Sequence, residues 1–330
     1  MINRRDFVAG SAAGLLTLSA GDLAELVAAT RQSSGNPTVA LVKSSDRHRA
    51  VIRVIDLLGV NPVRGKKVLL KPNFNTADPF PASTHNDTLI ALANKLKELG
   101  ATSIIIGERC GPPDTAAVLR DKGIDKLCLA HDLGLINFEA LAAEDWIRAR
   151  PDGSHWRDGF DIARPVLAAE SVVSTCCLKT HQYGGVFTMS LKNSVGITHK
   201  RNMTELHASL FSQRKMIAEI NQVYAPGLIL MDGMEVFVDG GPMSGKRKRA
   251  DLMIAGTDRV AVDAVGLAVL KELGSNRQIM ETKIFEQGQI ARAVELGLGV
   301  SSPAAIKIIT DDPVSRDYAD RLVGILQKES

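Results

Sequence analysis

The chain has 330 residues, of which 45% are hydrophobic and 23% are charged. A disordered tail, a collagen and a coiled-coil rod each need a more biased composition, so all three classes are excluded. The 40 Lys and Arg residues are set against 37 Asp and Glu, and the resulting net charge of +3 identifies no partner. Only 4% of the residues are aromatic, so base stacking contributes little and we expect no nucleic-acid partner.

The first 29 residues resemble an export signal. Arg4 and Arg5 stand directly before a weakly apolar stretch, residues 8–20, that is rich in Gly, Ala and Ser. This arrangement is typical of a twin-arginine signal peptide, and small residues ending at Ala29 predict cleavage after that position. The alternative is an ordinary amphipathic first helix. On the first interpretation residues 30–330 form an exported α/β domain, the protein is periplasmic or otherwise exported, and the twin-arginine export machinery is a partner.

Two kinds of feature are missing from the remaining sequence. No later run reaches the ~18 apolar residues of a membrane span, so we expect no stable membrane span in the mature chain. The cysteines contain no C-x-x-C pair, so an iron–sulfur cluster or a structural zinc held by them alone is not expected. Buried free thiols are the favoured interpretation of Cys110, Cys128, Cys176 and Cys177.

Apolar runs alternate with helical patterns through the first half of the chain. In order, they predict a strand at 38–42, a helix that is capped by Ser44-Ser45 and ends at Gly59, a strand at 68–70, a helix capped by Asp87 that ends at Gly100, a strand at 104–106, helical stretches near 114–120 and 124–132, and a strand at 135–138. A strand, a helix of about four turns and a second buried strand form a βαβ unit, so the strands at 68–70 and 104–106 should be parallel.

The second half of the chain repeats this alternation after an interruption. Residues 146–164, with Pro and Gly at three positions, are interpreted as an excursion or lobe boundary. The later elements are predicted as strands at 172–178, 228–231 and 252–255, a helix at 259–273, a helix near 289–296 and a last strand at 306–309. Asp258 should cap the helix that follows it, whereas Asp263 falls inside that helix and needs a partner or solvent. The whole pattern predicts an α/β fold, with a mostly parallel sheet flanked by helices and two coupled lobes with an interlobe crevice.

Polar residues follow several of the predicted strands directly. In open parallel sheets, ligands bind outside the carboxyl ends of the strands, and the residues found there are Lys71, Asn73, Glu108, Lys179, His181 and Asp232. Thr84 and His85 lie beside the predicted start of a helix, where free N–H groups favour an anion. Lys192 adds a further amine. We therefore expect a positively charged crevice that binds a carboxylate, a phosphate or a molecule carrying both.

Each of these residues also has a structural explanation. Lys71 and Lys179 can be explained as lysines at strand ends whose methylene groups pack along the sheet while the amine reaches solvent. His181 fits a hydrogen-bonded structural imidazole, and Asp232 fits an Asx turn with the glycine after it. The basic run at 246–249 is usually a solvated face and less often a contact for an anionic partner.

Several familiar motifs do not occur. The sequence has no G-x-G-x-x-G after a strand, no G-x-x-x-x-G-K-[ST], no G-x-S-x-G and no H-E-x-x-H. Dinucleotide oxidoreductases, P-loop NTPases, serine esterases and zincins therefore lose their main support. His181, His199 and His207 are spaced too loosely to argue for a metal. A divalent metal held by them with Asp232 or Glu108 stays open, and the cofactor is unknown.

An ordered set of short motifs resembles the domain of unknown function 362 family. Order and spacing carry this resemblance, which runs from about residue 38 to about 310, and the motifs are Lys71-Pro72-Asn73, Lys179-Thr180-His181, Ser190-Leu191-Lys192-Asn193, Asp232-Gly233, Gly240-Gly241-Pro242 and Asp258 to Asp263. Some family members carry a fused ferredoxin-type segment rich in C-x-x-C pairs, and this sequence shows none, so no iron–sulfur role is carried over. A fainter similarity to the nickel-dependent lactate racemase group informs the architecture alone.

Two functions of different classes fit these residues. The first is an enzyme of unknown reaction type that acts on a small anionic substrate, with His181, Lys179 and Asp232 as catalytic residues and His181 exchanging a proton. Its ligand-binding residues are predicted to be Lys71, Asn73, Thr84, His85, Glu108, Lys192 and Asn193. The alternative is a non-catalytic periplasmic binding protein for the same kind of small anionic molecule. A polyanion-binding surface at 246–249 is a third possibility with a small footprint.

Overall fold

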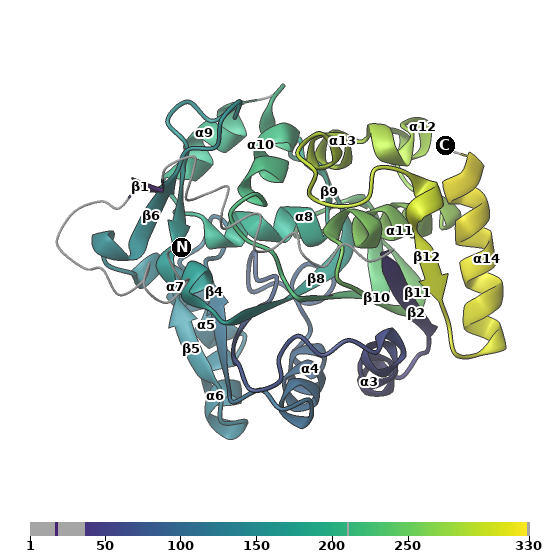
Figure 1. The fold of residues 1–330 in the computed structure, drawn as a ribbon, viewed down its shortest axis with the longest axis horizontal. Helices are drawn as coiled ribbons and strands as arrows, with labels where there is room; N and C mark the ends of the chain where they lie inside the picture. The colour runs from purple at the N-terminus through teal and green to yellow at the C-terminus, as the bar shows by residue number, and fades with distance from the viewer. Residues whose placement is uncertain (1–16, 19–36, 210, 329–330) are drawn as a thin grey trace.

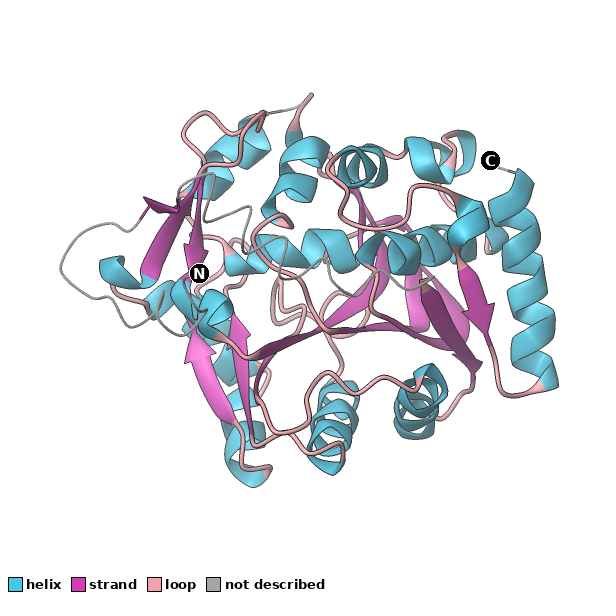
Figure 2. Cartoon of the chain, in the orientation of Figure 1, coloured by secondary structure: helices cyan, strands magenta, loops and turns pink. Residues whose placement is uncertain are grey.

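The computed structural model describes residues 17–18, 37–209 and 211–328. Apart from Thr17 and Leu18, the predicted leader at 1–29 lies outside the described residues, so the export signal stays a prediction. Within the described chain, a nine-stranded sheet is covered by helices on both faces (Figures 1 and 2). From edge to edge its strands are β12 (Lys307–Ile309), β2 (Thr38–Lys43), β11 (Gly245–Gly256), β10 (Leu228–Gly240), β8 (Ser171–His181), β3 (Lys67–Lys71), β4 (Ser103–Glu108) and β5 (Gly134–Asn137), and β9 (Val186–Thr188) also pairs with β8.

Most neighbouring strands of this sheet are parallel. The parallel pairs are β12–β2, β10–β8, β8–β3, β3–β4 and β4–β5, whereas β11 is antiparallel to both β2 and β10, and β9 is antiparallel to β8. The predicted α/β class, with a mostly parallel sheet flanked by helices, is therefore confirmed. The predicted parallel pairing of the strands around 68–70 and 104–106 is confirmed as β3 beside β4.

Successive residues of the central strands enter two different cores. In β2, Val39 and Leu41 pack on one face of the sheet, and Ala40 and Val42 pack on the other. Because side chains alternate along a strand, a strand covered on both faces needs apolar residues at every position. This requirement explains the continuous apolar runs in the sequence.

Helices cover each face of the sheet, as Figure 1 shows, and the alternating side chains are buried beneath them. One core is formed with α3 (Arg47–Leu58), α4 (Asn86–Glu98), α5 (Thr115–Asp121) and α6 (Ile124–Ala130). The core on the opposite face is formed with α8 (Ser190–Asn193), α11 (Arg259–Glu272), α12 (Arg277–Glu281), α13 (Gly288–Glu295) and α14 (Pro313–Lys328). Among the described helices, none combines the length and apolar character needed to cross a bilayer.

The segment predicted as an excursion forms a small second sheet. Its strands β6 (Trp146–Ala149) and β7 (Phe160–Ala163) are antiparallel, and β1 (Thr17–Leu18) pairs with β6. A third core lies between this sheet and the helices α7 (Arg164–Ala168), α9 (Asn202–Ala208) and α10 (Gln213–Ile220). The segment does leave the main sheet, while the boundary between two lobes stays a prediction.

Two helix caps differ from the sequence expectations. Asp46, rather than Ser44 or Ser45, caps α3, since its carboxylate accepts the N–H of Arg49 at 3.0 Å. His85, rather than Asp87, caps α4, and its Nδ1 accepts the Asp87 N–H at 3.1 Å. In both helices the residue immediately before the first turn can reach the free N–H groups, which is the geometry that an N-cap requires.

Candidate functional site

A cavity of about 360 Å³ lies at the carboxyl ends of β3, β4 and β8. Parallel strands end at a common edge of the sheet, which brings residues distant in sequence together. Beyond this edge the chain turns back through the β8–β9 hairpin and enters α8, adding Thr188, Lys192 and Asn193 to the wall. Of the predicted site residues, those that line the cavity are Lys71, Asn73, Glu108, Lys179, His181, Lys192 and Asn193. The volume is that of a small-molecule site.

Asp232 does not line this cavity, so its predicted place at a strand end is wrong. It lies in the interior of β10, with Cys177 beside it on β8. Its carboxylate accepts hydrogen bonds from the Thr88 hydroxyl and from Arg47 Nε, the latter at 3.1 Å. The strand continues through a β-bulge to Gly240, and Asp232 ties α3 and α4 to the sheet instead.

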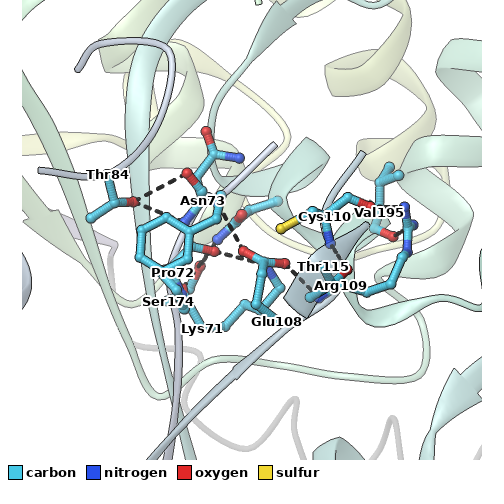
Figure 3. Close-up of polar contacts among 12 residues, drawn as sticks. Lys71, Pro72, Asn73, Thr84, Glu108, Arg109, Cys110, Thr115, Ser174 and Val195 are labelled. Atoms are coloured by element: carbon cyan, nitrogen blue, oxygen red, sulfur yellow. Dashed lines mark hydrogen bonds and ion pairs between the residues drawn. The ribbon is translucent and has the colours of Figure 1, made fainter. Parts of the chain in front are cut away.

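Thr84 and His85 also lie outside the cavity wall. The buried Thr84 hydroxyl accepts the Asn73 N–H at 2.8 Å, as Figure 3 shows, so Thr84 fixes the backbone of a residue that does line the cavity. His85 is half-buried, and its Nδ1 is engaged in capping α4. The structure therefore gives both residues a supporting position rather than a place beside the cavity.

Lys71 and Glu108 form a buried ion pair at the base of the cavity (Figure 3). Lys71 Nζ lies 2.6 Å from Glu108 Oε1 and also donates to the Pro72 carbonyl at 2.7 Å. Glu108 accepts two backbone N–H groups as well, from Phe74 at 2.8 Å and from Arg109 at 2.9 Å. Burial lowers the pKa of Lys71 and raises the pKa of Glu108, and their mutual attraction opposes both shifts. Main-chain hydrogen bonds to both partners therefore fix the position of this ion pair.

Two further lysines of the cavity lack a carboxylate partner among the described residues. Lys179 is fully buried, and its amine donates to the Ala82 carbonyl. The amine of Lys192 has neither a hydrogen-bond nor an ion-pair partner in the described chain. Burial and, to a smaller extent, the positive charges of Lys179 and Arg109 together lower the pKa of Lys192 to about 8. These amines make the cavity strongly positive.

His181 lies against the same lysines. Burial is the main cause that lowers the pKa of its imidazole to about 2, and the charges of Lys192 and Lys179 add to that effect. The ring is therefore uncharged at neutral pH. Its Nδ1 is buried and has no hydrogen-bond partner within the described protein.

Several buried polar atoms around the cavity have no partner within the described protein. Besides His181 Nδ1, they are Asn73 Oδ1, Thr188 Oγ1 and Asn193 Oδ1. Leaving a buried polar group without a hydrogen bond costs about 1–3 kcal/mol, so such groups are uncommon in folded proteins. All four atoms belong to residues that line the same cavity.

A carboxylate outside the cavity holds α8 in place. Asp263 is buried in α11 and accepts the N–H groups of Ser190 at 2.8 Å and Leu191 at 2.9 Å. The amide of Asn193 donates to Ser174 Oγ at 2.8 Å, which ties the other end of α8 to the sheet. Burial raises the pKa of Asp263 to about 7. The partner expected for Asp263 is thus the backbone of α8, whose position sets that of Lys192.

The residues of the cavity wall that the sequence reasoning missed include Arg109, Lys200 and Thr188. Arg109 is buried and donates to the carbonyls of Thr198 at 2.9 Å and Cys110 at 2.8 Å. Lys200 pairs with Glu139 at 2.7 Å, and Thr188 comes from the short strand β9. Arg109 could have been identified from the sequence, because it directly follows Glu108 at the end of a predicted strand. The other two lie on segments too short to show periodicity.

The side chains around the cavity suit an anion. Glu108 is its one acidic residue among the described ones, against five basic residues: Lys71, Arg109, Lys179, Lys192 and Lys200. Divalent cations are usually held by several oxygen or imidazole ligands. Within the described chain, no three His, Cys, Asp or Glu side chains gather in an arrangement that could hold a metal. The amines and amides present are instead typical of carboxylate and phosphate binding.

The basic run at 246–249 is largely occupied by its own neighbours. Arg247 pairs with Glu235 at 3.3 Å, and Arg249 pairs with Asp251 at 2.7 Å. Lys248 donates to a main-chain carbonyl. Because these charges are already partnered within the protein, the run adds little to the case for a polyanion-binding surface.

The solved structures that are similar to this chain include the following two. The lactate racemase apoprotein from Thermoanaerobacterium thermosaccharolyticum is 12% identical, with a TM-score of 0.44, and the match covers 88% of this chain and 86% of that one. A structural-genomics target protein from Thermotoga maritima is 14% identical, with a TM-score of 0.41, and the match covers 68% of this chain and 56% of that one. No curated protein matches. At these TM-scores, neither structure supports a conclusion about the function of this chain.

A family model gives a more specific result. The model described as a domain of unknown function, DUF362, matches residues 68–268. This span is shorter than the range of about 38 to 310 expected from the motifs, but it exceeds half of the chain and includes every predicted residue that lines the cavity. The chain therefore belongs to the domain of unknown function 362 family.

Proposed function

We propose that the protein is an enzyme that binds a small anionic substrate in the cavity and exchanges a proton with it through His181. The observation that carries this proposal is the convergence on one cavity of unpaired polar atoms and of two lysines without carboxylate partners. A carboxylate or phosphate would accept hydrogen bonds from the lysine amines, whereas the Oδ1 atoms of Asn73 and Asn193 are acceptors and need a donor, such as a hydroxyl group, on the same molecule. The Arg4-Arg5 leader pattern supports the further proposal that this enzyme is exported through the twin-arginine route.

The proposed roles follow from the position of each group. Lys179 and Lys192 attract the anion, and the Oδ1 atoms of Asn73 and Asn193, which have no partner among the described residues, orient it by accepting hydrogen bonds from donor groups on the same molecule. An anion between the lysines offsets their positive field, so its binding raises the pKa of His181 from about 2 and makes the imidazole a better proton acceptor. Proton transfer is thereby coupled to occupation of the cavity.

Thermal unfolding with added anions tests the binding step. Phosphate, acetate and pyruvate are compared with chloride at constant ionic strength, and we expect at least one of them to raise the melting temperature. A ligand at 100 times its dissociation constant stabilises a protein by about 2.7 kcal/mol. Lys192→Gln should remove this increase, whereas the control Lys246→Gln, at an exposed residue outside the cavity, should keep it. Equal stabilisation of wild type and Lys192→Gln would show that the anion binds elsewhere.

Catalysis needs a separate measurement. Mass spectrometry of small molecules that copurify with the protein identifies the ligand, and incubation followed by product analysis then measures turnover. His181→Ala should abolish turnover while the ligand still raises the melting temperature. Normal turnover in His181→Ala would refute the proton-transfer role. A ligand that binds but never changes would leave a non-catalytic binding protein as the function.

A further inference from the structure

Lys192 differs from the other amines of the cavity in having no partner. Lys71 is paired with Glu108, Lys200 is paired with Glu139, and the Lys179 amine donates to the Ala82 carbonyl. The Lys192 amine lines the cavity with neither a hydrogen bond nor an ion pair to any described residue. It is thus the cavity amine whose lone pair can be directed at a bound molecule once its proton is lost.

The surroundings of Lys192 favour loss of that proton. The charged side chains that act on it are Lys179 and Arg109, both positive, and no carboxylate counteracts them. With a pKa of about 8 instead of 10.5, the neutral amine near pH 7 is on the order of a hundredfold more abundant than for an ordinary lysine. Desolvation beside another cation is a recognised way to activate a lysine as a nucleophile.

A proton-transfer group lies next to this amine. A Cβ on Gly185 would lie 2.9 Å from Lys192 Cε and 3.1 Å from His181 Nδ1, so the amine-bearing end of Lys192 and the imidazole flank the same small space. Gly185 leaves that space open. The tie between Asp263 and the start of α8 fixes the backbone of Lys192 relative to this arrangement.

We propose that Lys192 forms an imine with the carbonyl group of an anionic oxo compound, of which a 2-oxo acid is the simplest. This inference rests on the proposed function, because the carboxylate of such a compound uses the anion-binding groups described above other than Lys192, whose amine bonds to the carbonyl carbon. It narrows the substrate class from any small anion to one that carries a ketone or aldehyde.

The reaction balances without a further reagent. The neutral amine attacks the carbonyl carbon, a C–N bond forms, and the π electron pair moves to the oxygen. The neutral imidazole of His181 donates its proton to that oxygen and accepts one from the nitrogen, which gives a carbinolamine. Loss of the hydroxyl group as water, with one proton, breaks the C–O bond and leaves the imine. The sum is amine plus carbonyl giving imine plus water, with no change of oxidation state.

Reductive trapping tests this proposal on the full chain. The protein is incubated at neutral pH with pyruvate and sodium cyanoborohydride, which supplies the hydride that fixes an imine as a secondary amine. Peptide mapping by mass spectrometry then locates the adduct. We expect labelling of Lys192 at least tenfold above that of any surface lysine, and we expect excess phosphate to reduce it. Lys192→Arg, which keeps the positive charge, should lose the label at this site, and the matched control Lys246→Arg, at an exposed residue outside the cavity, should retain it on Lys192.

The possible failures are distinguishable. If pyruvate or phosphate raises the melting temperature of the wild type and Lys192 stays unlabelled, the imine proposal is overturned and the anion-binding function stands. If neither anion raises the melting temperature and no label reaches Lys192, both proposals fail. Labelling spread evenly over exposed lysines also overturns the imine proposal, and this result comes from the wild type alone, so it does not depend on the folding of a variant.

Discussion

The Lys71–Glu108 ion pair allows a quantitative test of how the cavity base is built. Both side chains are about 1–2% exposed, and the charged atoms lie 2.6 Å apart. Glu108→Gln keeps the size of the side chain but removes its charge, which leaves the Lys71 amine buried without a counter-ion. Breaking a buried pair from one side costs about 3–5 kcal/mol. Because folded proteins are stable by only about 5–15 kcal/mol, this loss is a large fraction of the total.

Urea unfolding measures this free energy, and two comparisons isolate its cause. Glu281→Gln removes the acid of an exposed pair with Arg277, whose charged atoms lie 2.7 Å apart, and should cost only about 0.3–0.5 kcal/mol. Adding Lys71→Met to Glu108→Gln removes the stranded charge and should recover about 2 kcal/mol of the loss. A loss of stability below about 1 kcal/mol in Glu108→Gln would refute this reasoning. So would a double variant whose loss equals the losses of Glu108→Gln and Lys71→Met, measured separately and added together.

Three further outcomes are expected. Gly196→Ala should lower the melting temperature, because a Cβ there would lie 2.6 Å from both charged atoms of the buried pair, while Gly324→Ala, where a Cβ meets nothing within 4 Å, should not. Thr84→Val removes the acceptor of a buried N–H and should cost about 1–3 kcal/mol in urea unfolding; an unchanged midpoint would contradict this. Asp263 has a folded pKa of about 7 against an ordinary 3.8, so between these values the folded state keeps a proton that the unfolded state has lost, and its contribution to stability falls as pH rises through that window. Asp263→Asn should therefore flatten the decrease of melting temperature from pH 4 to 7, and an unaltered slope would show that other groups cause it.

Most of the fold follows from local patterns. Continuous apolar runs predicted strands buried on both faces, and the helix signals between them predicted crossover connections, which the β3–α4–β4 unit confirms. The long helix α14 was not predicted, although it buries apolar residues at helical spacing, including Tyr318, Leu322 and Leu326. That signal was present in the sequence and was not used.

The site residues at the ends of predicted strands could be predicted from the sequence. The residues that β9 and α8 bring to the cavity could not. Lys71, Glu108 and Lys179 meet because parallel strands end at one edge, a rule that needs no tertiary information. The prediction for Asp232 failed because Asp-Gly resembles a strand end, whereas pairing with β11 carries β10 through it. Thr188 and the orientation of Lys192 depend on a three-residue strand and a four-residue helix, which are too short to leave a periodic pattern.

The anchoring of α8 by Asp263 has a consequence for redesign of the cavity. This carboxylate belongs to α11, whose apolar side chains pack in the same core as Leu191 of α8. A small displacement of α11, produced by exchanging one of its buried apolar residues for a larger or smaller one, would carry α8 with it and move Lys192 along the cavity. The reach of the amine, and with it the length of the molecule accommodated, could then be adjusted while every wall residue keeps its chemical identity.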